Sequence, residues 1–99
     1  MSHTHLTRVA QELPDAWKST VVARFGPVHL KVLRMDGSPY PAESHTYAEG
    51  LLVIEGRLNL TIDGAEIAVG AGELFVVPAG VGHCVAPGST GTLVILDLG

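Results

Sequence analysis

The residues best suited to chemistry in this sequence are four potential metal ligands. Glu43, His45 and Glu49 lie within seven residues of one another, and His83 follows a loop rich in Gly and Pro at 78–82. The first three occupy odd positions, so in an extended segment their side chains would point to the same side. Imidazole nitrogen and carboxylate oxygen suit Fe, Mn, Zn, Ni and Cu, and two His with one carboxylate form the facial triad of non-haem iron sites. The pattern predicts a metal site, against the simpler alternative of polar residues where a strand enters solvent.

Neighbouring reactive side chains have more ordinary explanations. Tyr47 shares the odd parity and could hydrogen-bond to a ligand or substrate, or pack with its hydroxyl in water. Cys84 should point to the opposite face and act as a small buried apolar residue. We expect His29 to be a surface or hydrogen-bonded imidazole, and Trp17 and Phe25 to lie in the core or in a subunit contact.

Length and composition limit the classes of protein that this chain can be. A chain of 99 residues with 46% hydrophobic and 16% charged residues predicts one globular domain, residues 1–99. A net charge of −4 and only six Lys and Arg exclude a surface built for nucleic acid. Arg24, Arg34 and Arg57 could still bind a carboxylate or phosphate of a substrate, or be solvated strand ends.

The single cysteine and the hydropathy pattern bear on location and assembly. One cysteine excludes a disulfide framework and a multi-cysteine zinc site, and suits a reducing compartment. The sequence shows no secretory signal pattern and no apolar run near the ~20 residues of a membrane span, so we expect a cytoplasmic protein that does not bind a membrane. The high apolar fraction of so short a chain leaves apolar surface to cover, which favours a homodimer.

The expected secondary structure is almost entirely β. Short β-branched runs are separated by turns formed from 12 Gly and 6 Pro, which is typical of a sandwich or barrel. Runs that are apolar at consecutive positions predict strands buried on both faces, as in a barrel wall. The segment 6–13 has helical spacing and should cover one mouth of the barrel, while 36–41 should be a loop. The expected strands are 20–25, 28–35, 51–55, 58–63, 66–69, 74–77, 83–86 and 92–98.

The glycines around the candidate ligands add a resemblance to a known family. Gly37 is followed by five residues to Glu43, one to His45, three to Glu49 and six to Gly56. These spacings match the first sequence motif of the cupin family, Gly, five residues, His, one residue, His, three or four residues, Glu, six residues, Gly. One residue type differs, because Glu43 stands where the motif has its first His.

The second cupin motif is present as well. It reads Gly, five residues, Pro, one residue, Gly, two residues, His, three residues, Asn, and Gly72, Pro78, Gly80 and His83 match it in spacing and identity. The final Asn is replaced by Pro87. The two motifs, at 37–56 and 72–87, cover about half the chain, and the resemblance implies a single small antiparallel β-barrel, or jelly roll, of the cupin type.

The resemblance also implies a ligand set. His45, Glu49 and His83 correspond to three of the family's four metal ligands, and Glu43 takes the place of the fourth. If Glu43 binds, two imidazoles and two carboxylates favour Fe(II), Mn(II) or Zn(II), with Ni also compatible, over Cu(II). If Glu43 stays free, a triad with open positions remains. Glu43 could then act as a general base, and Tyr47 nearby is the second candidate catalytic residue.

Function does not follow from the family alone, because cupins include dioxygenases, isomerases, epimerases, decarboxylases and non-catalytic binders. The leading hypothesis is a metal-binding cupin whose divalent ion faces an apolar pocket and acts on, or binds, a small organic molecule. Two alternatives stay open. One is a non-catalytic module that binds or senses a small ligand, and the other is a metal-free structural cupin.

Overall fold

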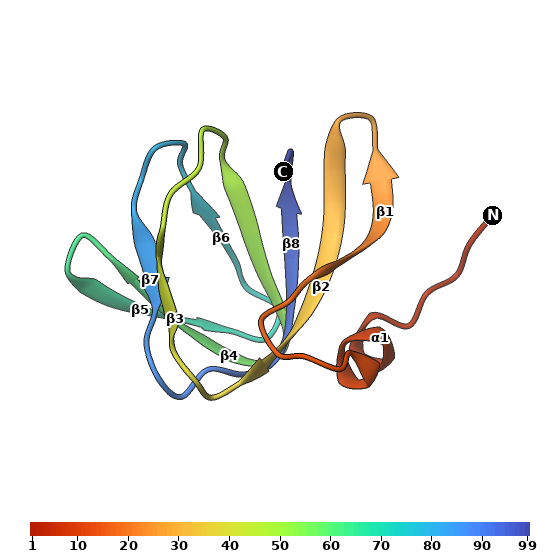
Figure 1. Cartoon of the computed structure of the whole chain (residues 1–99), viewed down its shortest axis with the longest axis horizontal. Coiled ribbons are helices and arrows are strands. Elements are labelled where there is room, and N and C mark those ends of the chain that lie inside the picture. Colours follow the sequence, from red (N-terminus) through yellow and green to blue (C-terminus); the bar gives the residue numbers. More distant parts are fainter.

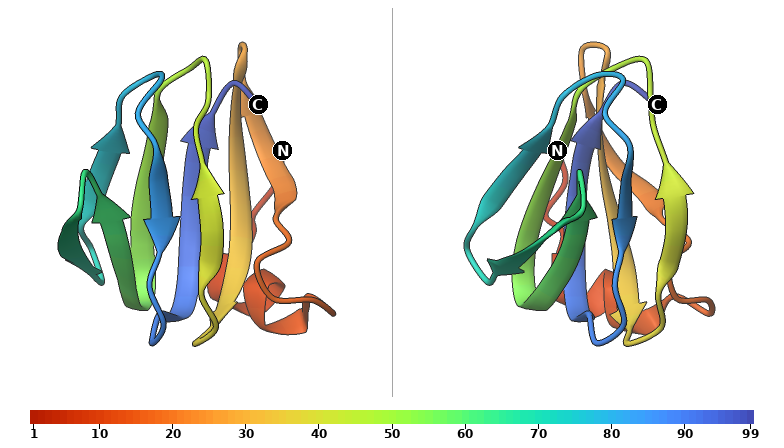
Figure 2. Two further views of the ribbon diagram at one scale, coloured as in Figure 1. Left: turned by 60° about the vertical axis from the view of Figure 1, so that its left-hand side comes forward. Right: turned by 90° about the vertical axis from the view of Figure 1, so that its left-hand side faces the viewer.

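The computed structural model describes residues 1–99 as one short helix and eight β-strands, all paired antiparallel. The strands follow the order β1-β2-β8-β4-β7-β3, and β5 and β6 both pair with β4. Figure 1 shows the sheet curling round an interior, with the end strands β3 and β1 on opposite sides of the view, and Figure 2 shows the same curl from two other sides. The predicted all-β architecture, a small antiparallel barrel with a short N-terminal helix, is confirmed. Its elements are α1 (Leu6–Glu12), β1 (Thr20–Phe25), β2 (Val28–Asp36), β3 (Tyr40–Glu43), β4 (Glu49–Ile62), β5 (Ala65–Gly70), β6 (Leu74–Val77), β7 (His83–Val85) and β8 (Thr90–Asp97).

The longest strand, β4, belongs to both halves of the barrel. Its first half pairs with β6 and β8, and its second half with β5 and β7. Two separate strands, 51–55 and 58–63, were expected here, which is wrong. The register of β4 against β8 shifts between Val53 and Glu55, and this bulge moves the inward-facing positions from odd numbers to even ones, so that Val53 and Leu58 both lie in the core. A bulge bends a strand without ending it. Because the inward-facing positions change parity at the bulge, the sequence on its two sides resembles two separate strands.

The segment between β2 and β4 also differs from expectation. Residues 36–41 were predicted as a loop, but β3 begins at Tyr40 and pairs with β7. Pro41 lies inside this strand, and proline disfavours a strand because it lacks an N–H group. It is tolerated here because β3 is at the end of the strand order and needs hydrogen bonds on one side only.

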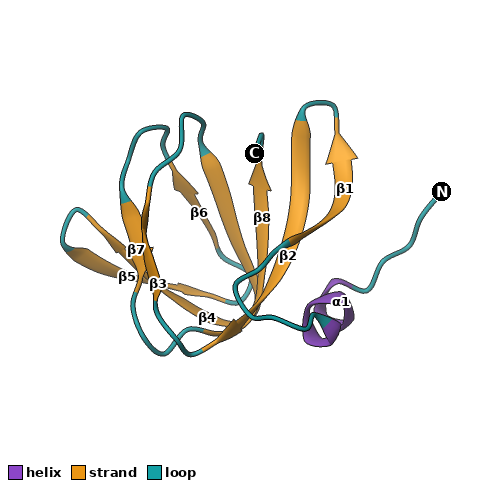
Figure 3. Cartoon of the chain, in the orientation of Figure 1, coloured by secondary structure: helices purple, strands orange, loops and turns teal.

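The interior and the outer face of the sheet hold separate apolar clusters. The helix contributes Ala10 to the outer one, together with Val32 of β2 and Val94 of β8, so it packs on the outside of the sheet. The expectation that it covers a barrel mouth is therefore wrong, and Figure 3 shows the helix beside the curled strands. With seven residues, this helix is far too short to cross a bilayer, and it is the chain's only one. The interior cluster consists of Leu33, Met35, Leu51, Val53, Leu58, Leu60, Val69, Val77 and Leu93.

Candidate metal centre

Three strand ends and one loop bring the four predicted ligands together. Glu43 ends β3 and lies directly across from His83, the first residue of β7. Glu49 is the first residue of β4, and His45 lies in the turn between β3 and β4. The backbone N–H of Gly80 donates to the carbonyl of His45 at 2.7 Å, which ties the two loops that hold the histidines. The structure thus brings Glu43, His45, Glu49 and His83 together at one place.

The spacing of the ligand atoms fits one bound ion. His83 Nε2 lies 3.2 Å from Glu49 Oε1 and 3.6 Å from Glu43 Oε1, and His45 Nε2 lies 3.5 Å from Glu43 Oε1 and 3.7 Å from Glu49 Oε2. With metal–ligand bonds of about 2.1 Å, neighbouring ligand atoms are about 3.4 Å apart on a tetrahedron and about 3.0 Å apart on an octahedron. One ligand atom from each residue lies within 4.8 Å of all the others. The four residues could therefore hold a divalent ion between them.

The imidazole nitrogens that face the carboxylates have no hydrogen-bond partner. Nε2 of His45 and Nε2 of His83 are both fully buried, and buried polar atoms are nearly always hydrogen-bonded. His83 Nδ1 lies 3.2 Å from the carbonyl oxygen of Val81, which can only accept, so Nδ1 donates and Nε2 carries the lone pair. An outer hydrogen bond of this kind is common on metal-binding histidines. A cation between the side chains would satisfy both nitrogens.

Glu49 is the more buried of the two carboxylates. Its side chain is 7% exposed, against 38% for Glu43. Burial raises the pKa of Glu49, with further upward contributions from a hydrogen bond to Asp97 and from the charge of Glu43, while His45 and His83 act in the opposite direction. In the metal-free protein Glu49 thus holds a proton more firmly than it does in the unfolded chain.

This shift predicts how the stability of the metal-free protein depends on pH. A carboxyl whose pKa is raised in the folded state stabilises it fully below the ordinary value of 4.5, and that contribution is lost as the pH rises through the raised pKa. A Glu49→Gln variant, whose amide imitates the protonated acid, should therefore gain in melting temperature relative to wild type as the pH increases. Thermal unfolding of both chelator-treated proteins across the mildly acidic range measures this. Parallel curves would contradict the prediction.

The four ligands open onto a cavity inside the barrel. The cavity has a volume of about 180 Å³ and is lined by 17 residues, of which 10 are hydrophobic. Because an apolar cavity of about 150 Å³ can hold benzene, this one accommodates a small organic molecule. The aliphatic part of the lining is Leu33, Leu51, Leu58, Leu60, Val85, Leu93 and Ile95.

Trp17 forms part of the cavity wall in addition to packing against the interior cluster. Its φ of 63° is unusual for a residue other than glycine, and it is held by a backbone hydrogen bond to Arg34 and by donation from Nε1 to Asp36 and Ser38, both at 3.0 Å. The Asp36 carboxylate also accepts hydrogen bonds from the side chain and the backbone N–H of Ser38. These bonds, and to a smaller extent the one from Trp17, lower the pKa of Asp36. Trp17 and Tyr40 meet with ring centroids 5.7 Å apart, giving the cavity an aromatic side.

The remaining predicted residues fall into two groups. Tyr47 lines the cavity and stacks on His45, with ring centroids 5.1 Å apart and planes 8° from parallel. Its catalytic role stays a prediction. His29 Nδ1 lies 2.9 Å from the carbonyl oxygen of Gly99, which confirms a hydrogen-bonded imidazole. Cys84 is half-buried and does not line the cavity, and Phe25 is 62% exposed, so a core position for it is wrong.

Two charged residues of the cavity were missed by sequence reasoning. Lys31 on β2 and Asp97 on β8 form an ion pair, with Nζ 3.0 Å from Oδ1, and both line the cavity. The available signal was parity, because Lys31 lies two residues before Leu33 of the interior cluster and the two side chains point to the same side of an extended strand. The arginines singled out instead, Arg24, Arg34 and Arg57, do not line the cavity.

Comparisons with known proteins agree with this architecture. A family model described as "Cupin domain" matches residues 33–99. Among solved structures, a cupin-2 domain containing protein from Shewanella frigidimarina is 22% identical with a TM-score of 0.85, covering 94% of this chain and 91% of the other. A protein from Neisseria meningitidis (21%, TM-score 0.83, 99% and 100% covered) and a cupin superfamily protein from Desulfitobacterium hafniense (18%, 0.77, 99% and 93%) are also similar. At these identities the likeness shows the fold alone. No curated protein matches this chain.

Proposed function

This chain belongs to the cupin family, and from that premise we propose that it holds one divalent metal ion through Glu43, His45, Glu49 and His83 and uses the cavity to bind and act on a small organic molecule. The observation that carries the proposal is the pair of buried, unpartnered Nε2 atoms facing two carboxylates. Two carboxylate ligands favour Mn(II), Fe(II) or Zn(II), with Ni(II) also compatible, over Cu(II).

The protein side chains have separable roles in this proposal. A bound ion would supply Lewis-acid or redox chemistry. Glu49 and His83, with side chains 7% and 4% exposed, are fixed parts of the site. Glu43 is 38% exposed, so it is the carboxylate that can turn from the ion towards a bound molecule and accept its proton. Tyr47 holds the ring of His45 by stacking and lines the cavity beside it.

Metal content tests this function first. Freshly purified, untagged protein should contain close to one equivalent of Fe, Mn, Zn or Ni by elemental mass spectrometry, or take it up after treatment with chelator and dialysis against the ion. Less than about a tenth of an equivalent after reconstitution, with no thermal stabilisation by excess metal, would overturn the proposal and favour the metal-free structural alternative. Metal at one equivalent and a ligand that stabilises the protein without being converted would identify a binding or sensing module.

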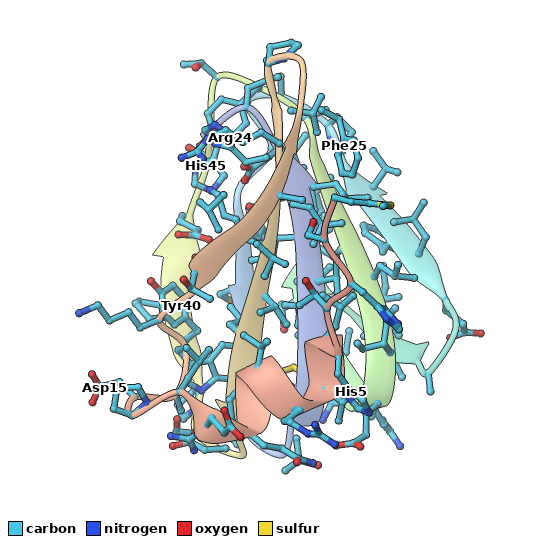
Figure 4. The ribbon with its side chains drawn as sticks, turned by 90° about the vertical axis from the view of Figure 1, so that its right-hand side faces the viewer. His5, Asp15, Arg24, Phe25, Tyr40 and His45 are labelled. Atoms are coloured by element: carbon cyan, nitrogen blue, oxygen red, sulfur yellow. The ribbon has the colours of Figure 1, made fainter.

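We also propose that the protein is a homodimer formed through the outer face of the part of its sheet made by β1, β2, β8, β4 and β6. Val76 of β6 lies across from Gly50, which lies across from Leu96, a residue packed in the outer cluster. The exposed apolar residues there are Leu74 (55%), Val76 (55%), Leu98 (52%) and Phe25 (62%). Figure 4 shows Phe25 on the side of the molecule away from His45 and Tyr40. A dimer would cover this surface and leave the cavity mouth free.

The oligomeric state should change when a charge is placed on this face. Val76→Lys puts an ammonium where an apolar contact is expected, so light scattering after size exclusion should give the mass of one chain in place of two. Val21→Lys is the matched control, because Val21 is also exposed, at 39%, but faces the same side of the sheet as Lys31. Monomeric wild-type protein would contradict the proposal.

A further inference from the structure

The cavity contains one cationic side chain. The sequence has six Lys and Arg, and only Lys31 lines the cavity. Its side chain is 16% exposed, and its ammonium group pairs with Asp97. An ammonium has three N–H donors, and Asp97 Oδ1 takes one, which leaves donors for another acceptor.

The charges around this lysine limit what the cavity can accept. Three carboxylates, Glu43, Glu49 and Asp97, and one ammonium, Lys31, line it together with two histidines, which add no charge as metal ligands. Their formal charges total −2, and a divalent ion brings the total to zero. In this balanced cavity a molecule with two negative charges would bring in a charge of −2, twice that of a monoanion, and an uncompensated charge costs more in a partly desolvated space than in water.

The remaining lining suits an apolar or aromatic body. Seven of the 17 lining residues are aliphatic, and Trp17 and Tyr40 add two ring faces. Trp17 is fixed by three hydrogen bonds, through its backbone N–H and its Nε1, so this surface is preformed. Phosphate recognition in proteins generally uses several donors, such as clustered Arg and Lys or a row of backbone N–H groups, and one paired lysine does not provide that.

We propose that the small molecule taken by this site has a mainly apolar or aromatic body and at most one negative charge, that Lys31 binds its single oxyanion, and that phosphorylated compounds are excluded. This inference rests on the proposed function, because it names the class of molecule that the same cavity binds.

Three probes with the same ring but different charge test the proposal. Benzyl alcohol is neutral, benzoate carries one negative charge and phenyl phosphate carries close to two at neutral pH. Trp17 is the chain's only tryptophan and lies in the cavity wall, so indole fluorescence reports on binding there. In zinc-loaded protein and phosphate-free buffer, we expect benzoate to bind at least about tenfold more tightly than phenyl phosphate. Phenyl phosphate equal to or tighter than benzoate overturns the proposal.

The role of Lys31 needs a variant that keeps the charge balance. Lys31→Met/Asp97→Asn removes one positive and one negative charge, and should weaken benzoate at least about tenfold while changing benzyl alcohol less than about threefold. Lys18→Met, at an exposed position near the cavity wall, is the matched control and should change neither. Unchanged benzoate affinity in the double variant would overturn the assignment to Lys31. If that variant does not fold, the ranking of the three probes on wild-type protein still decides whether double charge is excluded.

The two proposals fail in different ways. If the protein binds no metal, the proposed function fails, yet the probe ranking can still be measured, and the metal-free cavity should discriminate even more strongly against phenyl phosphate. If zinc binds at one equivalent and phenyl phosphate binds as well as benzoate, only the inference about the ligand is wrong.

Discussion

His83→Ala should abolish metal binding while the fold persists. His83 is 6% exposed, and its Nε2 is close to both carboxylates, 3.2 Å from Glu49 and 3.6 Å from Glu43. Its removal takes away one of two imidazoles and leaves a site of two carboxylates and one histidine. Loss of a group that merely orients a ligand weakens metal affinity about 10- to 100-fold, so loss of the ligand itself should cost at least about 100-fold. Metal content by elemental mass spectrometry should fall to background.

His29→Ala is the matched control for this variant. His29 is also an imidazole on the inner side of the sheet, but its Nδ1 is close to the backbone oxygen of Gly99 and it is outside the group of four ligands. It should keep one equivalent of metal and the rise in melting temperature that excess metal gives. If His83→Ala retained metal and His29→Ala lost it, the assignment of the centre would be wrong. Circular dichroism of both variants checks that the sheet is intact.

The candidate ligands could be predicted from sequence because they lie at or near strand ends that the motifs themselves position. Glu43 and His83 face each other across β3 and β7, and Glu49 begins β4 only six residues after Glu43. Parity alone was a weaker guide, since His45 lies in a turn, where strand alternation does not apply. Its place depends on the hydrogen bond from Gly80, a long-range contact between the two motifs.

The opposite side of the cavity was not predictable in the same way. Lys31, Asp97 and Trp17 come from β2, β8 and the segment before β1, and only the completed barrel brings them to one space. Nothing in the sequence indicates the positive φ of Trp17, because tryptophan rarely adopts a left-handed backbone conformation. The predicted position of the helix was wrong for a related reason. An apolar stripe predicts that one face of a helix is buried, but it does not indicate which surface of the protein covers that face.

The bulge in β4 is the part of the fold that should tolerate substitution least. Gly56, at φ 81°, faces Gly91 of β8, and a Cβ added to Gly56 would lie 1.9 Å from the backbone oxygen of Thr90. That atom belongs to the neighbouring strand and cannot move without shifting β8. Gly91 has the reciprocal constraint, because its Cβ would lie 2.0 Å from the oxygen of Glu55. The last glycine of the first motif is therefore required for close approach of two backbones, and its position in the motif reflects folding and not metal chemistry.

Gly56→Ala should accordingly destabilise the protein far more than Gly64→Ala. Gly64 has a similar φ of 76° in the turn before β5, but nothing lies within 4 Å of its added Cβ, so that variant measures backbone strain alone, about 1–2 kcal/mol. Gly56→Ala adds a backbone collision to the same strain and should cost more than about 3 kcal/mol of the roughly 5–15 kcal/mol typical of a domain. Urea unfolding of the metal-free proteins gives both values. Equal losses of unfolding free energy in the two variants would show that β8 can move away from β4. In that case the positive φ alone, and not the close approach of the two backbones, would explain the glycine at position 56.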